Sequence, residues 1–112
     1  MAQTPESKVK DKIKAILKAE GVYYAMPIGT GFGNAGVPDF LCCVNGRFVG
    51  IEAKTRGKRP TALQEKNFRE IERAGGVTIL INEDNVQALT GYLRIVKGDP
   101  TITSKYGGII EP

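Results

Sequence analysis

The sequence of 112 residues contains no histidine, and this absence removes several kinds of catalytic site. Ser-His-Asp and Cys-His catalysis, His-ligated zinc sites and His-based nucleases all require an imidazole. The only cysteines, Cys42 and Cys43, are adjacent and lack the spacing of a redox or zinc motif. We expect both to be buried packing residues that project to opposite faces of a strand. The metal chemistry that remains uses oxygen ligands, which favours Mg²⁺, Mn²⁺ or Ca²⁺.

Long apolar runs are also lacking. No segment resembles a signal peptide or approaches the length of a membrane span, so we expect a cytoplasmic protein with no membrane partner. The net charge of +4 favours an anionic partner, but charge alone leaves nucleic acid an open choice. The length predicts one domain, residues 1–112, with its core at about 5–96 and a tail at 98–112 that shows no clear period.

Asn45-Gly46 lies between two apolar runs, which predicts a two-residue β-hairpin turn. The hairpin strands are then Asp39–Val44 and Arg47–Lys54. Counting outward from the turn places Asp39 directly opposite Glu52, where opposed Cβ atoms stand about 5 Å apart. A bulge at the turn would shift this register by one residue and move Asp39 to the opposite face.

In this register, Lys54 lies on the same face as Asp39 and Glu52, because strand side chains alternate. Like charges placed directly opposite each other destabilise a sheet unless something compensates them. The alternative is a surface hairpin with solvated charges. Because Glu52 and Lys54 interrupt a strongly apolar strand, we favour a functional site in which a divalent cation compensates the two carboxylates.

Helical and strand periods predict the remaining elements. They are a helix at Pro5–Glu20 capped by Thr4, a strand at Val22–Ile28, a helix at Ala62–Arg73, a strand at Val77–Ile81 and a helix at Asn85–Val96 capped by Asp84. The order α-β-β-β-α-β-α predicts an α/β domain, with a central mixed sheet flanked by helices.

Five short segments in order resemble a VRR-NUC domain, a branch of the PD-(D/E)xK nuclease superfamily. They are Glu6, Gly36–Asp39, Ile51–Lys54, Thr61–Gln64 and Gly75-Gly76. The resemblance covers about residues 5–85 and extends to the short, free-standing members found in phages. It implies a restriction-endonuclease-like αβββαβ core. Phe40 departs from the family pattern, because many relatives have arginine after Pro-Asp. This departure leaves Asp39, Glu52 and Lys54 in place, and we expect it to affect only contacts with the substrate.

The resemblance implies that Asp39 and Glu52 hold Mg²⁺ or Mn²⁺ together with the backbone carbonyl of Ala53. Such a metal polarises a phosphodiester and lowers the pKa of a bound water. Lys54 would orient or deprotonate that water and stabilise the transition state. Two neighbouring carboxylates favour a charged ammonium, so we expect the electrostatic role.

Two further residues have competing interpretations. Glu6 lies on the core-facing stripe of the first helix, and the resemblance gives it a peripheral role in the metal shell or in positioning water. Its alternative is a first-turn acid stabilised by the helix dipole. Gln64 borders the active site in the family, and its alternative is a capping box with Thr61.

Residues 29–36 are rich in glycine and invite comparison with a phosphate-binding loop. A dinucleotide fingerprint requires a helix directly afterwards, whereas Pro38-Asp39 and a strand follow, so we expect no nucleotide cofactor. We expect this loop to admit the DNA backbone, with Asn34 as a donor. The basic run contributes Arg56, Lys58 and Arg59 as phosphate contacts, and its alternative is a solvated turn.

Together these features predict a metal-dependent DNA endonuclease that hydrolyses phosphodiester bonds in the phage or bacterial host cytoplasm. The resemblance to free-standing family members, which act as junction resolvases, implies branched DNA as the substrate, cut in the manner of a Holliday-junction resolvase. One metal site makes one cut and a four-way junction is two-fold symmetric, so a homodimer would match it. The alternatives are a less selective flap or nicking endonuclease and a non-catalytic DNA-binding module. A pure binder has no need for an unfavourable carboxylate pair.

Overall fold

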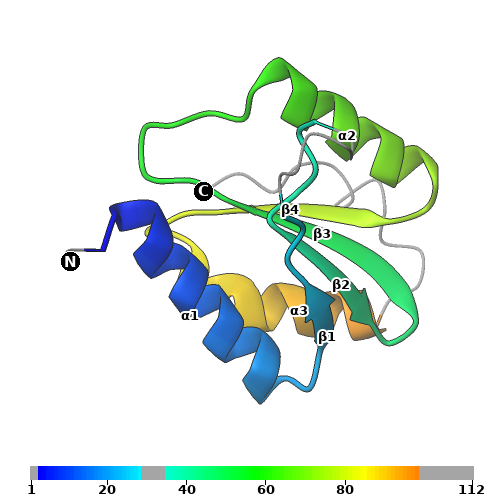
Figure 1. Cartoon of the computed structure of the whole chain (residues 1–112). Helices are drawn as coiled ribbons and strands as arrows, with labels where there is room; N and C mark the ends of the chain where they lie inside the picture. The colour runs from blue at the N-terminus through cyan, green and yellow to red at the C-terminus, as the bar shows by residue number, and fades with distance from the viewer. Residues whose placement is uncertain (1–2, 29–34, 99–112) are drawn as a thin grey trace.

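The computed structural model describes residues 3–28 and 35–98, which form a small α/β domain. Its four-stranded sheet has the order β1 (Tyr23–Ala25), β2 (Phe40–Val44), β3 (Arg47–Ala53) and β4 (Val77–Ile81). Neighbours β1–β2 and β2–β3 are antiparallel, and β3–β4 are parallel. The sheet lies between α2 on one face and α1 and α3 on the other (Figure 1). The predicted α/β class with a mixed sheet is therefore confirmed.

The β2–β3 hairpin turns at Asn45-Gly46, as predicted. Both residues have positive φ, 52° and 83°, which is the backbone of a type I′ turn. The register runs without a bulge from Val44 opposite Arg47 to Phe40 opposite Ile51. Asp39 lies one residue before β2, so continuing this register places it opposite Glu52.

The first two helices begin at the predicted caps. α1 (Pro5–Ala19) starts after Thr4, whose side chain accepts a hydrogen bond from the Ser7 N–H at 3.1 Å. α2 (Ala62–Arg73) starts after Thr61. A side-chain acceptor at the cap satisfies a backbone donor that has no partner within the helix, which explains why both starts could be located.

The start of the third helix was predicted incorrectly. A 3₁₀ turn, η1 (Val86–Ala88), precedes α3 (Leu89–Gly98), and Asp84 does not cap either. The Asp84 carboxylate is instead bound by the Arg56 guanidinium, whose Nε lies 3.0 Å from both oxygens. A charged, two-oxygen contact takes the acceptor that a cap would have used. Within residues 3–28 and 35–98, no helix combines the length and the apolar character needed to cross a membrane.

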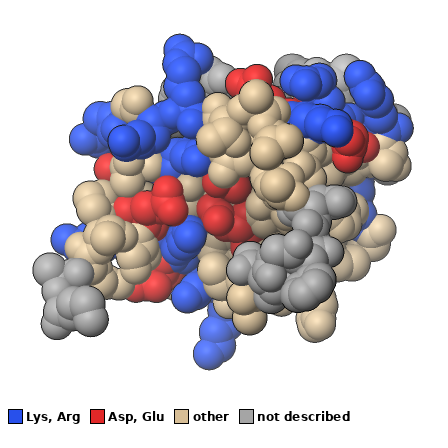
Figure 2. All heavy atoms as spheres, turned by 45° about the horizontal axis from the view of Figure 1, so that its top comes forward, with Lys and Arg blue, Asp and Glu red and all other residues tan. Residues whose placement is uncertain are grey.

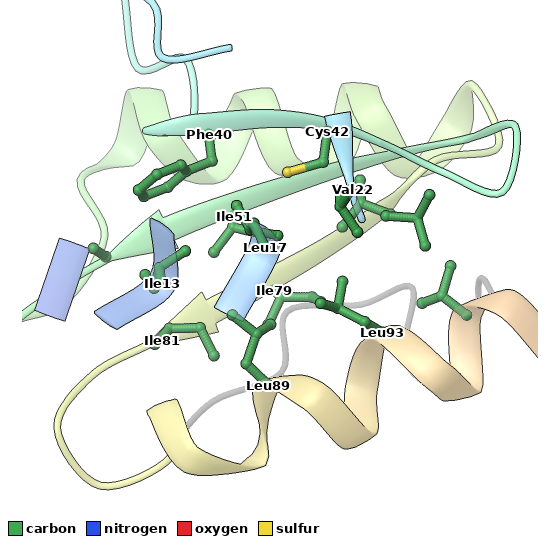
Figure 3. Close-up of a cluster of buried hydrophobic side chains, with 14 of the residues drawn as sticks. Ile13, Leu17, Val22, Phe40, Cys42, Ile51, Ile79, Ile81, Leu89 and Leu93 are labelled. Carbon is green, nitrogen blue, oxygen red and sulfur yellow. The ribbon is translucent and has the colours of Figure 1, made fainter. Parts of the chain in front are cut away.

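The hydrophobic core lies on the sheet face covered by α1 and α3 (Figure 3). Alternate residues of β2, such as Phe40 and Cys42, point into it, as does Ile51 of β3. The helices add residues at helical spacing. Those of α1 are Val9, Ile13 and Leu17, and those of α3 are Leu89, Leu93 and Val96.

On the opposite face of the sheet, α2 packs against β4 and leaves part of the face uncovered. Cys43 points to this face and is exposed, so the expectation that both cysteines are buried was wrong for Cys43. The prediction that they project to opposite faces is confirmed, since Cys42 is buried. Tyr23, which pairs with Cys43, is also exposed. Local alternation predicts the side on which a residue lies, but not whether another element covers that side.

We expect Gly46→Ala to lower the free energy of unfolding by about 1 kcal/mol, because an L side chain is strained at positive φ. No heavy atom lies within 4 Å of the added Cβ at Gly46, so backbone strain is the only cost. Gly91→Ala is the matched control, because Gly91 lies inside α3 with equally open space. It should raise stability by about 0.5 kcal/mol. Urea unfolding of both variants tests the opposite signs, and equal shifts would contradict the turn geometry.

Candidate active site

Two hydrogen bonds from backbone N–H groups to carboxylates join Asp39, just before β2, to the end of β3. The Asp39 backbone N–H donates to Glu52 Oε1 at 3.2 Å, and the Ala53 N–H donates to Asp39 Oδ2 at 2.9 Å. Each carboxylate is thus fixed through one oxygen by the backbone of the facing strand. The structure brings these two predicted residues together in the predicted register.

Glu52 is almost fully buried, with 3% of its surface exposed. Burial and the neighbouring Asp39 charge raise the pKa of Glu52 to about 8, although Lys54 and the Asp39 N–H favour the charged form. A carboxylate in this position is short of positive charge. Either a proton or additional positive charge would stabilise Glu52 in this position.

Lys54 lies beside Glu52 on the same face, as predicted. Its Nζ is 3.6 Å from Glu52 Oε2, and its side chain is only 15% exposed. The backbone N–H of Lys54 donates to the Ile81 carbonyl at 2.9 Å, which continues the β3–β4 pairing beyond the last residue of β3. The lysine is therefore positioned by the sheet and not by a free loop.

Gln64 forms the predicted capping box and also contacts Glu52. Its Oε1 accepts from the Thr61 N–H at 2.8 Å while the Gln64 N–H donates to Thr61 Oγ1 at 3.2 Å, which is the capping box. Its Nε2 donates to Glu52 Oε2 at 3.0 Å. An amide side chain has both an acceptor and a donor, so one glutamine can cap α2 and bind the buried carboxylate.

Glu6 reaches the site through a residue that the sequence did not single out. Lys10 Nζ lies 3.4 Å from Glu6 Oε2, one helical turn away, and 3.5 Å from Asp39 Oδ1. Partial burial would lower the pKa of Lys10, but the charges of Asp39 and Glu6 outweigh it and raise this pKa. The spacing of four residues from Glu6 was the signal available in the sequence, because such residues share a helix face.

Gly36 is another positioning residue, because the segment before Asp39 approaches α2 closely. At Gly36, where φ is +81°, an added Cβ would lie 2.5 Å from the Leu63 carbonyl carbon and 2.7 Å from the Gln64 nitrogen. Asn67 donates to the Ala35 carbonyl at 2.7 Å and strengthens the same contact. Glycine is required here so that Asp39 and the first turn of α2 can share one site.

The predicted DNA-contacting residues differ in their surroundings. Arg56 is paired with Asp84, and its backbone N–H donates to Glu83 Oε1 at 2.7 Å. Lys58 and Arg59 are exposed and line a surface pocket beside this ion pair. Asn34 lies outside the described residues. The turn that follows β3 therefore presents three exposed basic residues, of which Arg56 is paired with Asp84.

The donor set suits a hard divalent cation. Among residues 3–28 and 35–98 there is no group of three His, Cys, Asp or Glu side chains placed to hold a metal. The carboxylate ligands available are Asp39 and Glu52, to which the Ala53 carbonyl was predicted as a third oxygen. Asp39 Oδ1 and Glu52 Oε2 are bound by side chains alone, through Lys10, Lys54 and Gln64. Side chains can move aside, and oxygen-only ligation fits Mg²⁺ or Mn²⁺.

No protein-family model matches this sequence, and no curated protein matches it. Its function must therefore be inferred from the residues and their geometry. The informative features are a nearly buried Glu52 carboxylate that accepts the Asp39 N–H, an Asp39 carboxylate that accepts the Ala53 N–H, and the Lys54 ammonium beside Glu52.

We expect Glu52→Gln to stabilise the metal-free protein at high pH. The folded-state pKa of about 8 exceeds the ordinary 4.5, so the stabilisation by protonated Glu52 is complete below about 4.5 and lost as the pH rises through about 8. In EDTA, the free energy of unfolding of wild type should fall by on the order of 2 kcal/mol between about pH 5 and pH 9, and Glu52→Gln should not show this fall.

Thermal unfolding across this pH range measures the effect. Glu65→Gln is the control, because Glu65 is an exposed acid in the first turn of α2. The explanation fails if wild type and Glu52→Gln follow parallel pH profiles in EDTA.

Proposed function

We propose that this protein is a metal-dependent DNA endonuclease of the VRR-NUC type, within the PD-(D/E)xK superfamily, and that its preferred substrate is branched DNA. The observation that carries the proposal is the Asp39–Glu52 pair, in which Glu52 is nearly buried and Lys54 lies 3.6 Å from it. A structural role gives no reason to bury one carboxylate beside another. Phosphodiester hydrolysis at a divalent cation does.

The order and placement of the elements support a restriction-endonuclease-like core. Asp39 directly precedes β2, Glu52 lies at the end of β3 with Lys54 just beyond it, and Gln64 lies in the first turn of α2. Glu6 occupies the first turn of α1. These residues come from four separate segments and are linked by the contacts described above, with Glu6 joined through Lys10, which supports the proposal.

Asp39 and Glu52 would hold Mg²⁺ or Mn²⁺, with the Ala53 carbonyl completing the protein ligands. A cation bound there supplies Lewis-acid polarisation of the phosphodiester and a lowered pKa for an attacking water. Gln64 and the Asp39 N–H keep the Glu52 carboxylate in one orientation through the hydrogen bonds described above. The protein thus fixes its ligands before substrate arrives.

Lys54 supplies positive charge where negative charge develops on the phosphorus-centred transition state. Its ammonium is held next to Glu52 Oε2 and is only partly exposed, so solvent screens it weakly. In this role the Lys54 ammonium stabilises the oxygens of the phosphoryl group. Glu6 and Lys10 form the outer edge of the same site.

Charge on the surface supports a nucleic acid substrate. Acidic side chains gather near the middle of one face, with Lys and Arg side chains on several sides of them (Figure 2). Lys58 and Arg59 are exposed on the turn that follows β3. Basic groups around a small acidic centre attract a phosphate backbone while leaving the centre to a cation.

The choice of branched DNA rests on the resemblance to free-standing family members, and the choice of a homodimer rests on symmetry. A domain with one such site makes one cut, whereas resolving a four-way junction requires two cuts related by a two-fold axis. A homodimer with cyclic two-fold symmetry presents two equivalent sites. We therefore propose a dimer that acts as a junction resolvase.

We expect purified protein to cut a synthetic four-way junction with Mg²⁺ or Mn²⁺ and not with EDTA. Asp39→Asn and Glu52→Gln should lower the cleavage rate by at least about a hundredfold, because each removes a charged metal ligand. Both should still shift the junction in a gel. Asp11→Asn is the control, because this exposed acid of α1 pairs with Lys14 outside the site.

Three outcomes of this assay would change the proposal. Activity that survives both substitutions would overturn the site assignment. Equal cutting of linear duplex and junction would indicate the flap or nicking endonuclease, and binding without any cleavage would indicate the non-catalytic module. Size-exclusion chromatography with light scattering tests the dimer.

The two functions of Gln64 should separate under mutation. Thr61→Ala removes the cap and should cost about 1 kcal/mol of stability while leaving cleavage near wild type. Gln64→Ala should cost a similar stability and also lower the cleavage rate by about tenfold, because Glu52 loses an orienting partner. Urea unfolding and cleavage kinetics of both variants measure the effect on stability and the effect on cleavage separately. Equal cleavage rates would show that Gln64 only caps α2.

A further inference from the structure

The lysines of the site are divided between its carboxylates. Lys54 faces Glu52 Oε2, and Lys10 faces Asp39 Oδ1. The other oxygen of each carboxylate accepts a backbone N–H. Lys10 therefore occupies the Asp39 oxygen that the backbone does not use.

Lys10 is built into this position and is not simply a surface charge that happens to be nearby. Its side chain is 28% exposed and Asp39 is 21% exposed, so solvent screens their attraction only in part. Glu6 contacts the same ammonium from the first turn of α1 and gives it a second anchor on its own helix. The neighbouring Lys14 makes only an exposed ion pair, with Asp11.

We infer that Lys10 is a resident counter-ion, which neutralises Asp39 in the metal-free protein and competes with the divalent cation for Asp39 Oδ1. The inference rests on the proposed function, because it takes Asp39 to be a metal ligand. When a cation binds, Lys10 gives up Asp39 Oδ1 and remains tethered to Glu6. Glu6 is then a positioning residue for Lys10.

Competition of this kind sets the metal affinity of the site. A cation must displace an ammonium that already satisfies Asp39, so binding is weaker than the carboxylate pair alone would give. In return, the two acids are not left facing each other without compensation before metal arrives. After release, the Lys10 ammonium is free to approach a substrate phosphate beside the same site.

Lys10→Met tests the inference, because methionine keeps the length of the side chain and removes its charge. Stability is measured by thermal unfolding without DNA, in EDTA and over a MgCl₂ titration, at a pH above the Glu52 pKa of about 8. The variant should have a lower Tm than wild type in EDTA, because Asp39 loses its counter-ion. Its apparent Kd for Mg²⁺ should be about fivefold tighter.

Two control variants separate charge from packing. Lys10→Arg keeps the charge and should bind Mg²⁺ within about twofold of wild type. Lys14→Met removes a lysine from the same helix away from the site and should leave the affinity unchanged. A purely structural role for Lys10 would lower the Tm by the same amount in EDTA and in Mg²⁺.

The outcomes distinguish the inference from the function on which it rests. If wild type is stabilised by Mg²⁺ but Lys10→Met binds it equally or more weakly, the competition is refuted and the proposed metal site stands. If Mg²⁺ does not stabilise wild type at any concentration tested, both the competition and the metal site are refuted.

Discussion

The paired hydrogen bonds between Asp39 and the end of β3 are the constraint on which the site depends. They exist only in one hairpin register, and the positive φ values at Asn45-Gly46 fix that register. A shift by one residue would turn the Asp39 side chain to the core face of the sheet, away from the face that carries Glu52. A turn at the far end of the hairpin therefore decides whether two acids meet, although neither turn residue contacts them.

The parts of the fold that were predictable are those with local causes. The hairpin, the caps at Thr4 and Thr61 and the alternation in β2 and β3 all follow from residues close in sequence. Predictions failed where a distant residue intervened. Arg56 took the Asp84 carboxylate from its expected cap, and the partial cover of the outer sheet face left Cys43 exposed.

The site shows the same division between local and distant causes. Asp39, Glu52 and Lys54 could be placed by strand register, whereas Lys10 could not, because its contact with Asp39 joins α1 to the start of β2. Gln64 was ambiguous for another reason: one amide serves both the helix cap and Glu52. Stability of α2 and orientation of Glu52 thus share a residue, so loss of the Gln64 side chain affects both.

The parallel pairing of β3 with β4 has a consequence for the order of folding. Asp39 and Glu52 are 13 residues apart and join through a hairpin, whereas β4 can pair only after the chain has crossed back through α2. Hairpins close within microseconds, and crossover connections form later. The contact between Asp39 and Glu52 therefore needs only the hairpin, whereas the parallel partner of β3 is supplied by the longer connection through α2.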